Sequence, residues 1–163
     1  MKVLQGYPRS TEEEILKTVN RAGIAVILGP RGTGKTQLAV NAIRDRIFHT
    51  PFSALYITAA DLFDSLRKDV ADGGHGKTLR RFSQVGLLVI DELQESWDTK
   101  YEMTELTRLM DKRYSEMLPT ILVSNLTDEG FRRRVGPSIV SRIQEGGLML
   151  PCMWPSFRAQ LVQ

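Results

Sequence analysis

A glycine-rich segment near the N-terminus has the spacing of a phosphate-binding loop. Residues 29–36 read Gly-Pro-Arg-Gly-Thr-Gly-Lys-Thr and match the pattern G-x-x-x-x-G-K-[ST] at every position. Glycines let successive backbone N–H groups turn inward around an anion, and the helix expected to follow directs its positive end at the same point. Lys35 would reach the β- and γ-phosphates, and Thr36 would offer its hydroxyl to Mg²⁺. A glycine-rich turn that binds nothing is the alternative, but the strand and helix expected on either side favour a nucleoside triphosphate site.

Two adjacent acids supply the carboxylates that such a site also needs. Asp91 and Glu92 follow an apolar run at 87–90, so they stand at the end of an expected strand. Successive side chains of a strand point to opposite faces, which predicts different tasks for the two acids. We expect Asp91 to hold Mg²⁺, directly or through water, and Glu92 to polarise the attacking water. Asn125 ends another apolar run and could orient that water without adding charge, although a Ser-Asn pair also suits a turn.

Short apolar runs alternate with helical periodicities along the chain. Strands are predicted at 24–28, 54–58, 87–90, 120–124 and 148–150. Because these runs are apolar throughout, they are typical of a parallel sheet that is covered by helices on both faces. Ligands of such sheets bind at the carboxyl ends of the strands, which is where the phosphate loop, the two acids and Asn125 fall.

Capping signals and glycines delimit the helices expected between these strands. Ser10 and Glu13 have the spacing of a capping box at the start of the first helix. Further helices are predicted at 35–48, from Asp61 onward, at 99–117, and as two short helices of which the second runs from Pro137 to Gly146.

Length and composition limit the kind of protein this is. A chain of 163 residues with 42% hydrophobic and 25% charged residues is typical of one globular domain. The sequence has no apolar run of bilayer-spanning length, and its first residues lack the apolar core of a signal peptide. A single cysteine, Cys152, excludes an internal disulfide and a Cys-rich zinc site. These features predict a cytoplasmic protein.

The basic residues cluster at two places. The net charge of +3 and the isoelectric point of about 9.2 are by themselves weak evidence for a nucleic-acid partner. A run of three arginines lies at 132–134, and Lys77, Arg80 and Arg81 form a second cluster.

The ordered set of motifs resembles that of the AAA+ ATPases. Residues 29–36 resemble a Walker A motif, residues 87–92 a Walker B motif, and Ser124-Asn125 a sensor-1 position. The chain is most similar to the DnaC/DnaI helicase loaders and to the IstB transposition helpers. The similarity spans about residues 20–158, and its further segments are 56–62, 109–114, 120–125, 139–143 and 154–158.

The resemblance implies an α/β P-loop NTPase fold, a three-layer sandwich with a five-stranded parallel sheet, of the AAA+ type without a C-terminal lid. It also implies rings or spirals with ATP at the joint between neighbours. Arg142 aligns with the arginine finger that reaches a neighbour's γ-phosphate, Arg158 with a sensor-2-like arginine, and Arg113 could be a second intersubunit arginine. An exposed helix-end Arg142 and a surface Arg158 are the alternatives. The residues expected to bind ATP are Gly29, Pro30, Arg31, Gly32, Thr33, Gly34, Lys35, Thr36, Gln37 and Arg158.

In initiators and loaders, the helical region after the second strand carries an insertion that faces the central channel. Here that region is about 59–82, and a solvated helix face diluted by nearby aspartates is the alternative to DNA contact. Cations along a channel would track a single-stranded backbone. The cations in question are Arg67, Lys68, Lys77, Arg80 and Arg81.

The resemblance therefore implies a DNA-replication ATPase that binds ATP and Mg²⁺, self-associates through ATP and holds single-stranded DNA. Its expected partner is a DnaB-type replicative helicase, and hydrolysis is expected to be slow before assembly. Only some 20 residues precede the first strand. We therefore expect residues 1–163 to be a single AAA+ domain that lacks the N-terminal helicase-gripping domain, which weakens the case for helicase binding. An IstB-like helper that binds duplex DNA and a transposase, or a decoy inhibitor of a loader or helicase, are the alternatives.

Overall fold

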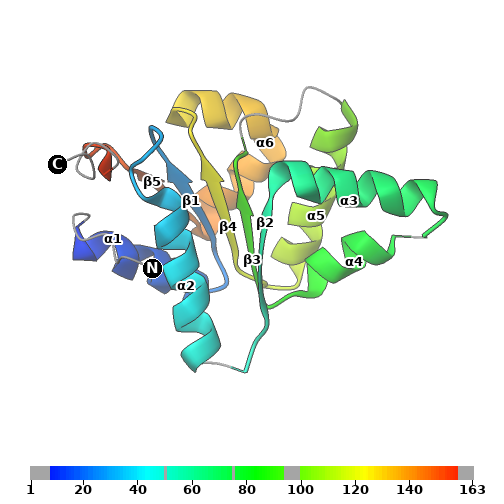
Figure 1. The fold of residues 1–163 in the computed structure, drawn as a ribbon, viewed down its shortest axis with the longest axis horizontal. Coiled ribbons are helices and arrows are strands. Elements are labelled where there is room, and N and C mark those ends of the chain that lie inside the picture. The colour runs from blue at the N-terminus through cyan, green and yellow to red at the C-terminus, as the bar shows by residue number, and fades with distance from the viewer. Residues whose placement is uncertain (1–7, 50, 75, 94–99, 158–163) are drawn as a thin grey trace.

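A computed structural model describes residues 8–49, 51–74, 76–93 and 100–157. Its strands form one sheet in the order β2-β3-β4-β1-β5, in which every neighbouring pair is parallel (Figure 1). The five predicted strands are confirmed, and β3 and β5 each extend one residue further. The strands are β1 (Ile24–Leu28), β2 (Ala54–Thr58), β3 (Leu87–Asp91), β4 (Thr120–Ser124) and β5 (Leu148–Pro151).

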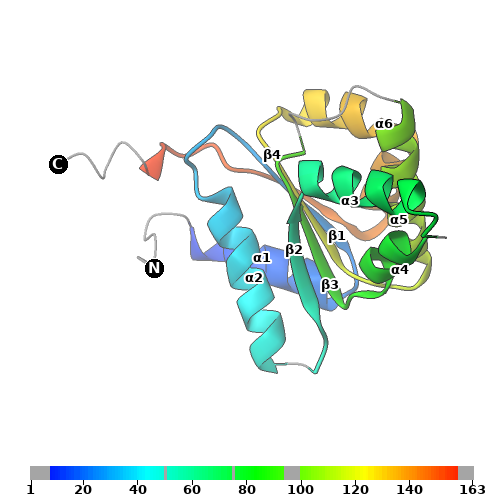
Figure 2. The same cartoon turned by 45° about the vertical axis from the view of Figure 1, so that its right-hand side comes forward.

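Helices cover both faces of this sheet. One pair, α1 and α2, packs on one face, and the remaining helices of the described residues pack on the other (Figure 2). This confirms the predicted three-layer α/β sandwich. None of the described helices is long and apolar enough to cross a bilayer. The helices are α1 (Arg9–Asn20), α2 (Lys35–His49), α3 (Ala59–Ala71), α4 (Lys77–Gln84), α5 (Lys100–Ser115) and α6 (Asp128–Gly146).

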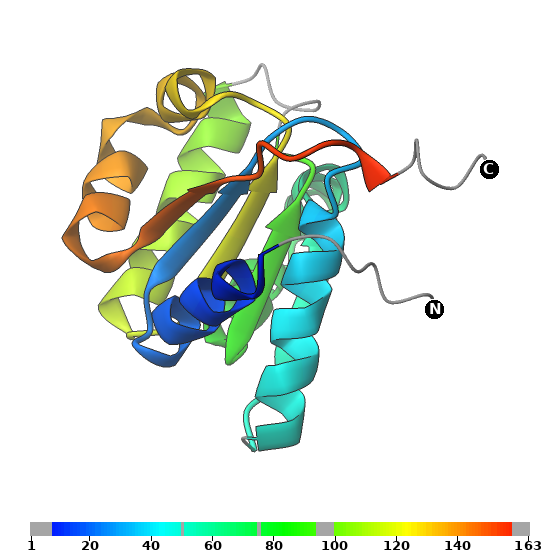
Figure 3. The same cartoon turned by 90° about the vertical axis from the view of Figure 1, so that its left-hand side faces the viewer.

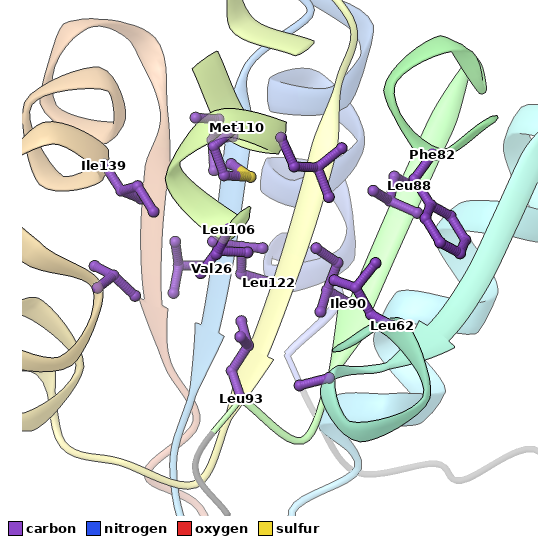
Figure 4. Packing of buried hydrophobic residues seen from close by; sticks show 14 of the residues in the cluster. Val26, Leu62, Phe82, Leu88, Ile90, Leu93, Leu106, Met110, Leu122 and Ile139 are labelled. Atoms are coloured by element: carbon purple, nitrogen blue, oxygen red, sulfur yellow. The ribbon is translucent and has the colours of Figure 1, made fainter. Parts of the chain in front are cut away.

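The core is divided by the sheet into two apolar layers. Val26 and Leu122 point toward α5 and α6, where they meet Leu106, Met110 and Ile139 (Figure 4). Their neighbours along the strands point to the opposite layer, beneath α1 and α2. The strands β1, β3 and β4 are buried at every residue. The two edge strands, β2 and β5, are only partly buried, so the expectation that every strand is fully covered is wrong for both of them.

Three helix boundaries show where local signals succeeded and failed. The capping box at Ser10 is wrong, because α1 begins one residue earlier with Pro8 at its N-cap and no side-chain cap. The helix predicted from Asp61 begins at Ala59, because the Thr58 hydroxyl accepts a hydrogen bond from the Asp61 N–H at 3.2 Å and caps it. The two short helices are confirmed, since Gly136 breaks α6 with φ 79° and ψ 168°. Residue 99, the predicted start of the next helix, lies outside the described residues.

Candidate nucleotide-binding site

The loop between β1 and α2 has a backbone that glycine adopts without strain. Gly29, Gly32 and Gly34 have φ angles of 140°, 85° and 80°. A Cβ atom at Gly29 would lie 2.5 Å from the carbonyl oxygen of Cys152, so the absence of a side chain also permits close packing there. The loop leads directly into α2, whose N-terminus directs the positive end of its dipole toward an anion held by the loop.

The lysine of this loop is folded back against the loop itself. Lys35 is 6% exposed, and its Nζ donates a hydrogen bond to the Pro30 carbonyl at 2.7 Å. The Thr33 hydroxyl donates to the same carbonyl oxygen at 3.0 Å. The ammonium group is thus retained within the loop, where a phosphate oxygen could replace the carbonyl as its partner. Gln37, also predicted to bind nucleotide, donates instead to the Asn41 amide oxygen at 2.9 Å.

Three side chains from three elements meet at the end of β3. Thr36 Oγ1 donates to Asp91 Oδ2 at 2.7 Å, and the Tyr56 hydroxyl on β2 donates to the same oxygen at 2.8 Å. Asp91 is only 4% exposed. The structure therefore brings the two predicted magnesium ligands, Thr36 and Asp91, into direct contact.

Tyr56 is a site residue that the sequence reasoning missed. Burial raises the pKa of the Tyr56 hydroxyl above its ordinary value, and the hydrogen bond to Asp91 raises that pKa further. The signal that could have found Tyr56 was its place near the end of β2. That signal becomes useful only when β2 is known to lie beside β3.

The donor set fits a magnesium ion that shares its coordination with phosphate. A hydroxyl and a carboxylate are the hard oxygen ligands that Mg²⁺ prefers, and such sites usually take further oxygens from phosphate and water. No group of three or more His, Cys, Asp or Glu side chains suited to a metal occurs in the part of the chain that the structure describes. Thr36 and Asp91 together supply one hydroxyl and one carboxylate of this kind.

Glu92 has a different environment from Asp91, because β3 ends at Asp91 and Glu92 begins the turn that follows the strand. Its side chain is exposed, and its backbone adopts the left-handed region with φ 58°. The strained turn is fixed on both sides: the Glu92 N–H donates to Asp91 Oδ1 at 2.6 Å, and the Leu93 N–H donates to the Val123 carbonyl at 3.1 Å. Non-glycine residues in such conformations cluster at functional sites.

Asn125 follows β4, the strand that lies between β1 and β3. In the register of the sheet, Ser124 pairs with Leu28, the last residue before the phosphate loop. Ser124 Oγ accepts a hydrogen bond from the Leu126 N–H at 3.2 Å, which fixes the turn that carries Asn125. Asn125 thus lies at the same edge of the sheet as the phosphate loop, Asp91 and Glu92.

Arg142 lies on α6, on the other face of the sheet from α2. Its Nη1 donates to the Ser138 carbonyl at 2.9 Å and to the Ser138 hydroxyl at 2.8 Å. Its Nη2 lies 3.0 Å from Asp111 Oδ1, close enough for charge attraction but without hydrogen-bond alignment. The guanidinium also lies over the Tyr114 ring, 5.4 Å from its centroid. The Arg142 side chain is 24% exposed and held within its own chain, unlike a free helix-end arginine.

Arg113 is not an intersubunit residue, and that prediction is wrong. Its side chain is 0% exposed and lies near the N-terminal ends of β3 and β4. The guanidinium donates to the carbonyls of Phe82, Val85 and Pro119 at 2.7–2.9 Å and to the Thr120 hydroxyl at 2.9 Å. Burial lowers the pKa of Arg113 to about 10. Because its side chain is fully buried, the Arg113 guanidinium cannot reach a neighbouring subunit. The other predicted arginine, Arg158, lies outside the described residues.

The basic residues after β2 form a smaller exposed surface than the sequence suggested. Lys77, Arg80 and Arg81 project from one face of α4 and are exposed. On α3, Lys68 is exposed too. Arg67, by contrast, pairs with Asp64 at 2.7 Å and with the buried carboxylate of Glu102 on α5. The two acids therefore neutralise much of the positive charge of Arg67.

The arginine run at 132–134 is largely compensated within α6. Arg132 pairs with Asp128 at 2.5 Å, and Arg133 pairs with Glu129 at 2.6 Å. Both pairs have the i,i+4 spacing of neighbours on a helix face. This run adds little net positive charge to the surface. The exposed face of α4 therefore remains the main candidate surface for binding an anionic polymer.

Comparison with known proteins agrees with these observations. The family model for IstB-like ATP binding proteins matches residues 12–141. The Escherichia coli K12 protein YdaV is 34% identical over 137 residues, which are 83% of this chain and 55% of the relative. The replicative helicase loader DnaC of Escherichia coli K12 is 30% identical over 139 residues, 83% of this chain and 56% of the relative. The chain thus spans little more than half the length of these relatives.

Solved structures share the fold. A crystal structure of the DnaC helicase loader superposes with a TM-score of 0.76 at 20% identity, covering 90% of this chain and 93% of that one. The replication initiator DnaA bound to AMPPCP and single-stranded DNA gives a TM-score of 0.76 at 22% identity, covering 93% of this chain and 47% of that one. These neighbours identify the sheet and helices as a P-loop AAA+ ATPase fold.

Proposed function

Because the chain belongs to the family of IstB-like ATP-binding proteins, we propose that it hydrolyses ATP with Mg²⁺ as an ATPase of DNA replication. The observation that carries the proposal is the convergence of Thr36 and Tyr56 on one oxygen of Asp91, beside a loop of phosphate-binding geometry. A P-loop that binds only an adventitious anion has no need of a buried carboxylate aligned with its threonine.

Each side chain of the site then has a separate task. The backbone N–H groups of the loop and the Lys35 ammonium bind the β- and γ-phosphates. Thr36 and Asp91 hold Mg²⁺, which when bound neutralises charge on the phosphate oxygens. Glu92 accepts a hydrogen bond from the attacking water and takes up its proton as the water oxygen bonds to the γ-phosphorus. The bond between the γ-phosphorus and the β–γ bridging oxygen breaks in the same reaction, and the electron pair leaves with ADP. Asn125 orients the same water.

We further propose that Arg142 acts on the nucleotide of a neighbouring subunit. It lies on a different face of the sheet from its own loop, so a role in hydrolysis requires a second copy of the chain. An arginine supplied by a neighbour can raise the rate about 10³–10⁵-fold. Hydrolysis should therefore be slow at low protein concentration and rise steeply as the chain assembles.

Hydrolysis and binding can be separated by substitution. Glu92→Gln keeps the shape of the side chain but cannot accept the proton, so it should bind Mg²⁺-ATP normally and hydrolyse it at least a hundredfold more slowly. Mixing Glu92→Gln with Arg142→Ala should restore some activity. Where the two variants meet, the Arg142→Ala subunit can supply an intact Glu92 and the Glu92→Gln subunit an intact Arg142. Normal hydrolysis by Glu92→Gln would overturn its assigned role. A failure of rescue at every mixing ratio would overturn the role of Arg142 in a neighbouring site.

For the DNA partner we propose single-stranded DNA, bound along α4. Lys77, Arg80 and Arg81 are exposed on one face of this helix and could track a phosphodiester backbone. Replacing all three by Ala should reduce the slope of log affinity against log salt by about 2, since each single-strand phosphate contact contributes roughly 0.7. The matched control replaces Arg132 and Arg133, which are already ion-paired, and should leave the slope nearly unchanged.

The helicase-loading role follows from relatives rather than from this site. Relatives bearing the name replicative helicase loader DnaC support a DnaB-type helicase as the partner. The family match equally favours a transposition helper, which would prefer duplex DNA and bind a transposase. Filter binding with single- and double-stranded DNA, with and without ATP, separates the two functions. Preference for the duplex would favour the transposition helper.

A further inference from the structure

The phosphate loop has outward-facing carbonyl groups, which accept hydrogen bonds from a segment near residue 155. The Thr33 carbonyl accepts a hydrogen bond from the Trp154 indole Nε1–H at 2.8 Å. The Gly32 carbonyl accepts one from the Phe157 backbone N–H at 2.9 Å. We name residues 152–157 the C-terminal strap. The strap passes along the loop between β1 and α2, as Figure 3 shows in red beside blue.

The strap is anchored at both of its ends. At its start, the Cys152 N–H donates to the Leu28 carbonyl at 2.6 Å, which continues the pairing of β5 with β1. Cys152 and Phe157 are buried, and the Trp154 ring packs against the apolar layer beneath α1 and α2. The absence of a side chain at Gly29 lets the strap approach the loop this closely. Its contacts therefore belong to the folded core.

The geometry of the peptide bond links these contacts to nucleotide binding. A trans peptide is planar, and its C=O and N–H point in opposite directions. The Gly32 carbonyl shares a peptide with the Thr33 N–H, and the Thr33 carbonyl shares one with the Gly34 N–H. When the strap holds both carbonyls outward, it holds both N–H groups inward, toward the position of the phosphates.

We propose that Trp154 is a positioning residue of the nucleotide site, acting through the Thr33–Gly34 peptide. The inference rests on the proposed binding of ATP and extends it, because it couples the C-terminal end of the chain to the phosphate loop. A ligand or partner that displaces the strap would thereby weaken nucleotide binding without touching the nucleotide.

Trp154→Phe tests this proposal, since it removes the indole N–H while retaining an aromatic ring. We expect its affinity for Mg²⁺-ADP, measured by calorimetry, to fall about fivefold, the equivalent of one hydrogen bond. The melting temperature without nucleotide serves as the check on folding. Met153→Ala is the matched control: its side chain is 78% exposed on the same strap, and its affinity should equal that of the wild type.

A second measurement uses the fluorescence of Trp154 itself. The chain has one other tryptophan, Trp97, so Trp97→Phe isolates the signal. Saturation with Mg²⁺-ADP should shift the emission of Trp154 and change its quenching by acrylamide.

The outcomes separate the two proposals. If the wild type binds no nucleotide, the proposed function fails, and this inference fails with it. If the wild type binds and Trp154→Phe binds equally well, only the inference is overturned. Should Trp154→Phe not fold, the fluorescence decides, and an emission that nucleotide leaves unchanged overturns the inference.

Discussion

The fully buried Arg113 gives a prediction whose size follows from its contacts. Replacing Arg113 by Met keeps an extended apolar side chain but removes every donor. The carbonyls of Phe82, Val85 and Pro119 and the Thr120 hydroxyl then lose a buried partner. An unsatisfied buried group costs about 1–3 kcal/mol, and relief of the buried charge offsets part of the sum. We expect Arg113→Met to lower the free energy of unfolding by about 3–5 kcal/mol.

Urea denaturation followed by circular dichroism measures this loss. For a chain of 163 residues, the same change should lower the melting temperature by roughly 6–20 °C. Arg108→Met is the control, because Arg108 lies on the same helix with its side chain 60% exposed and should change the free energy by less than about 0.5 kcal/mol. A wild-type unfolding free energy for Arg113→Met, together with loss of assembly-dependent hydrolysis, would refute the reasoning and restore an intersubunit role.

Three further predictions follow from single contacts. Tyr56→Phe removes a hydrogen bond to Asp91, so titrations should show an affinity for ATP about fivefold weaker with Mg²⁺ and unchanged without it; equal loss in both would contradict the contact. Burial raises the pKa of the Cys152 thiol from 9.0 to about 11, so its contribution to stability is present below pH 9 and is lost as the pH rises toward 11. The urea midpoint of the wild type should therefore fall toward, or below, that of Cys152→Ala as the pH rises from 9 to 11. A difference between the two midpoints that does not change with pH would contradict this prediction. Asp111→Asn removes the charge facing Arg142 and should raise assembly-dependent hydrolysis several-fold; a fall to the level of Arg142→Ala would show that Asp111 supports the arginine.

The parts of the site that were predictable depend on local pattern. The phosphate loop is contiguous and its glycines fix its backbone, and the strand carrying Asp91 is an unbroken apolar run. The parallel sheet therefore followed from the sequence, whereas the separate tasks of Asp91 and Glu92 stay a prediction. The ion pairs that neutralise Arg132 and Arg133 could also have been predicted, because an acidic residue lies four positions before each arginine.

The parts that failed depend on contacts between distant segments. The Tyr56 hydroxyl reaches Asp91 only because β2 lies beside β3, and strand order is not written in any local spacing. Arg113 occurs among polar residues that suit an exposed helix face, yet it bonds to the carbonyls of Phe82 and Val85, which lie 31 and 28 positions away along the chain. The strap likewise joins residues 121 positions apart, Thr33 and Trp154. In each case a long-range hydrogen bond overrides the local pattern.

Calorimetric titration of the folded chain with Mg²⁺-ATP measures whether the loop at residues 29–36 binds a nucleotide. We expect saturable binding at one site per chain, abolished in Lys35→Ala at an unchanged melting temperature. We also expect weaker binding when Mg²⁺ is removed, because Thr36 and Asp91 would lose the ion that joins them to the phosphates. Absence of any heat of binding in folded protein, or binding that persists undiminished in Lys35→Ala, would contradict the assignment of this edge of the sheet as a nucleotide site.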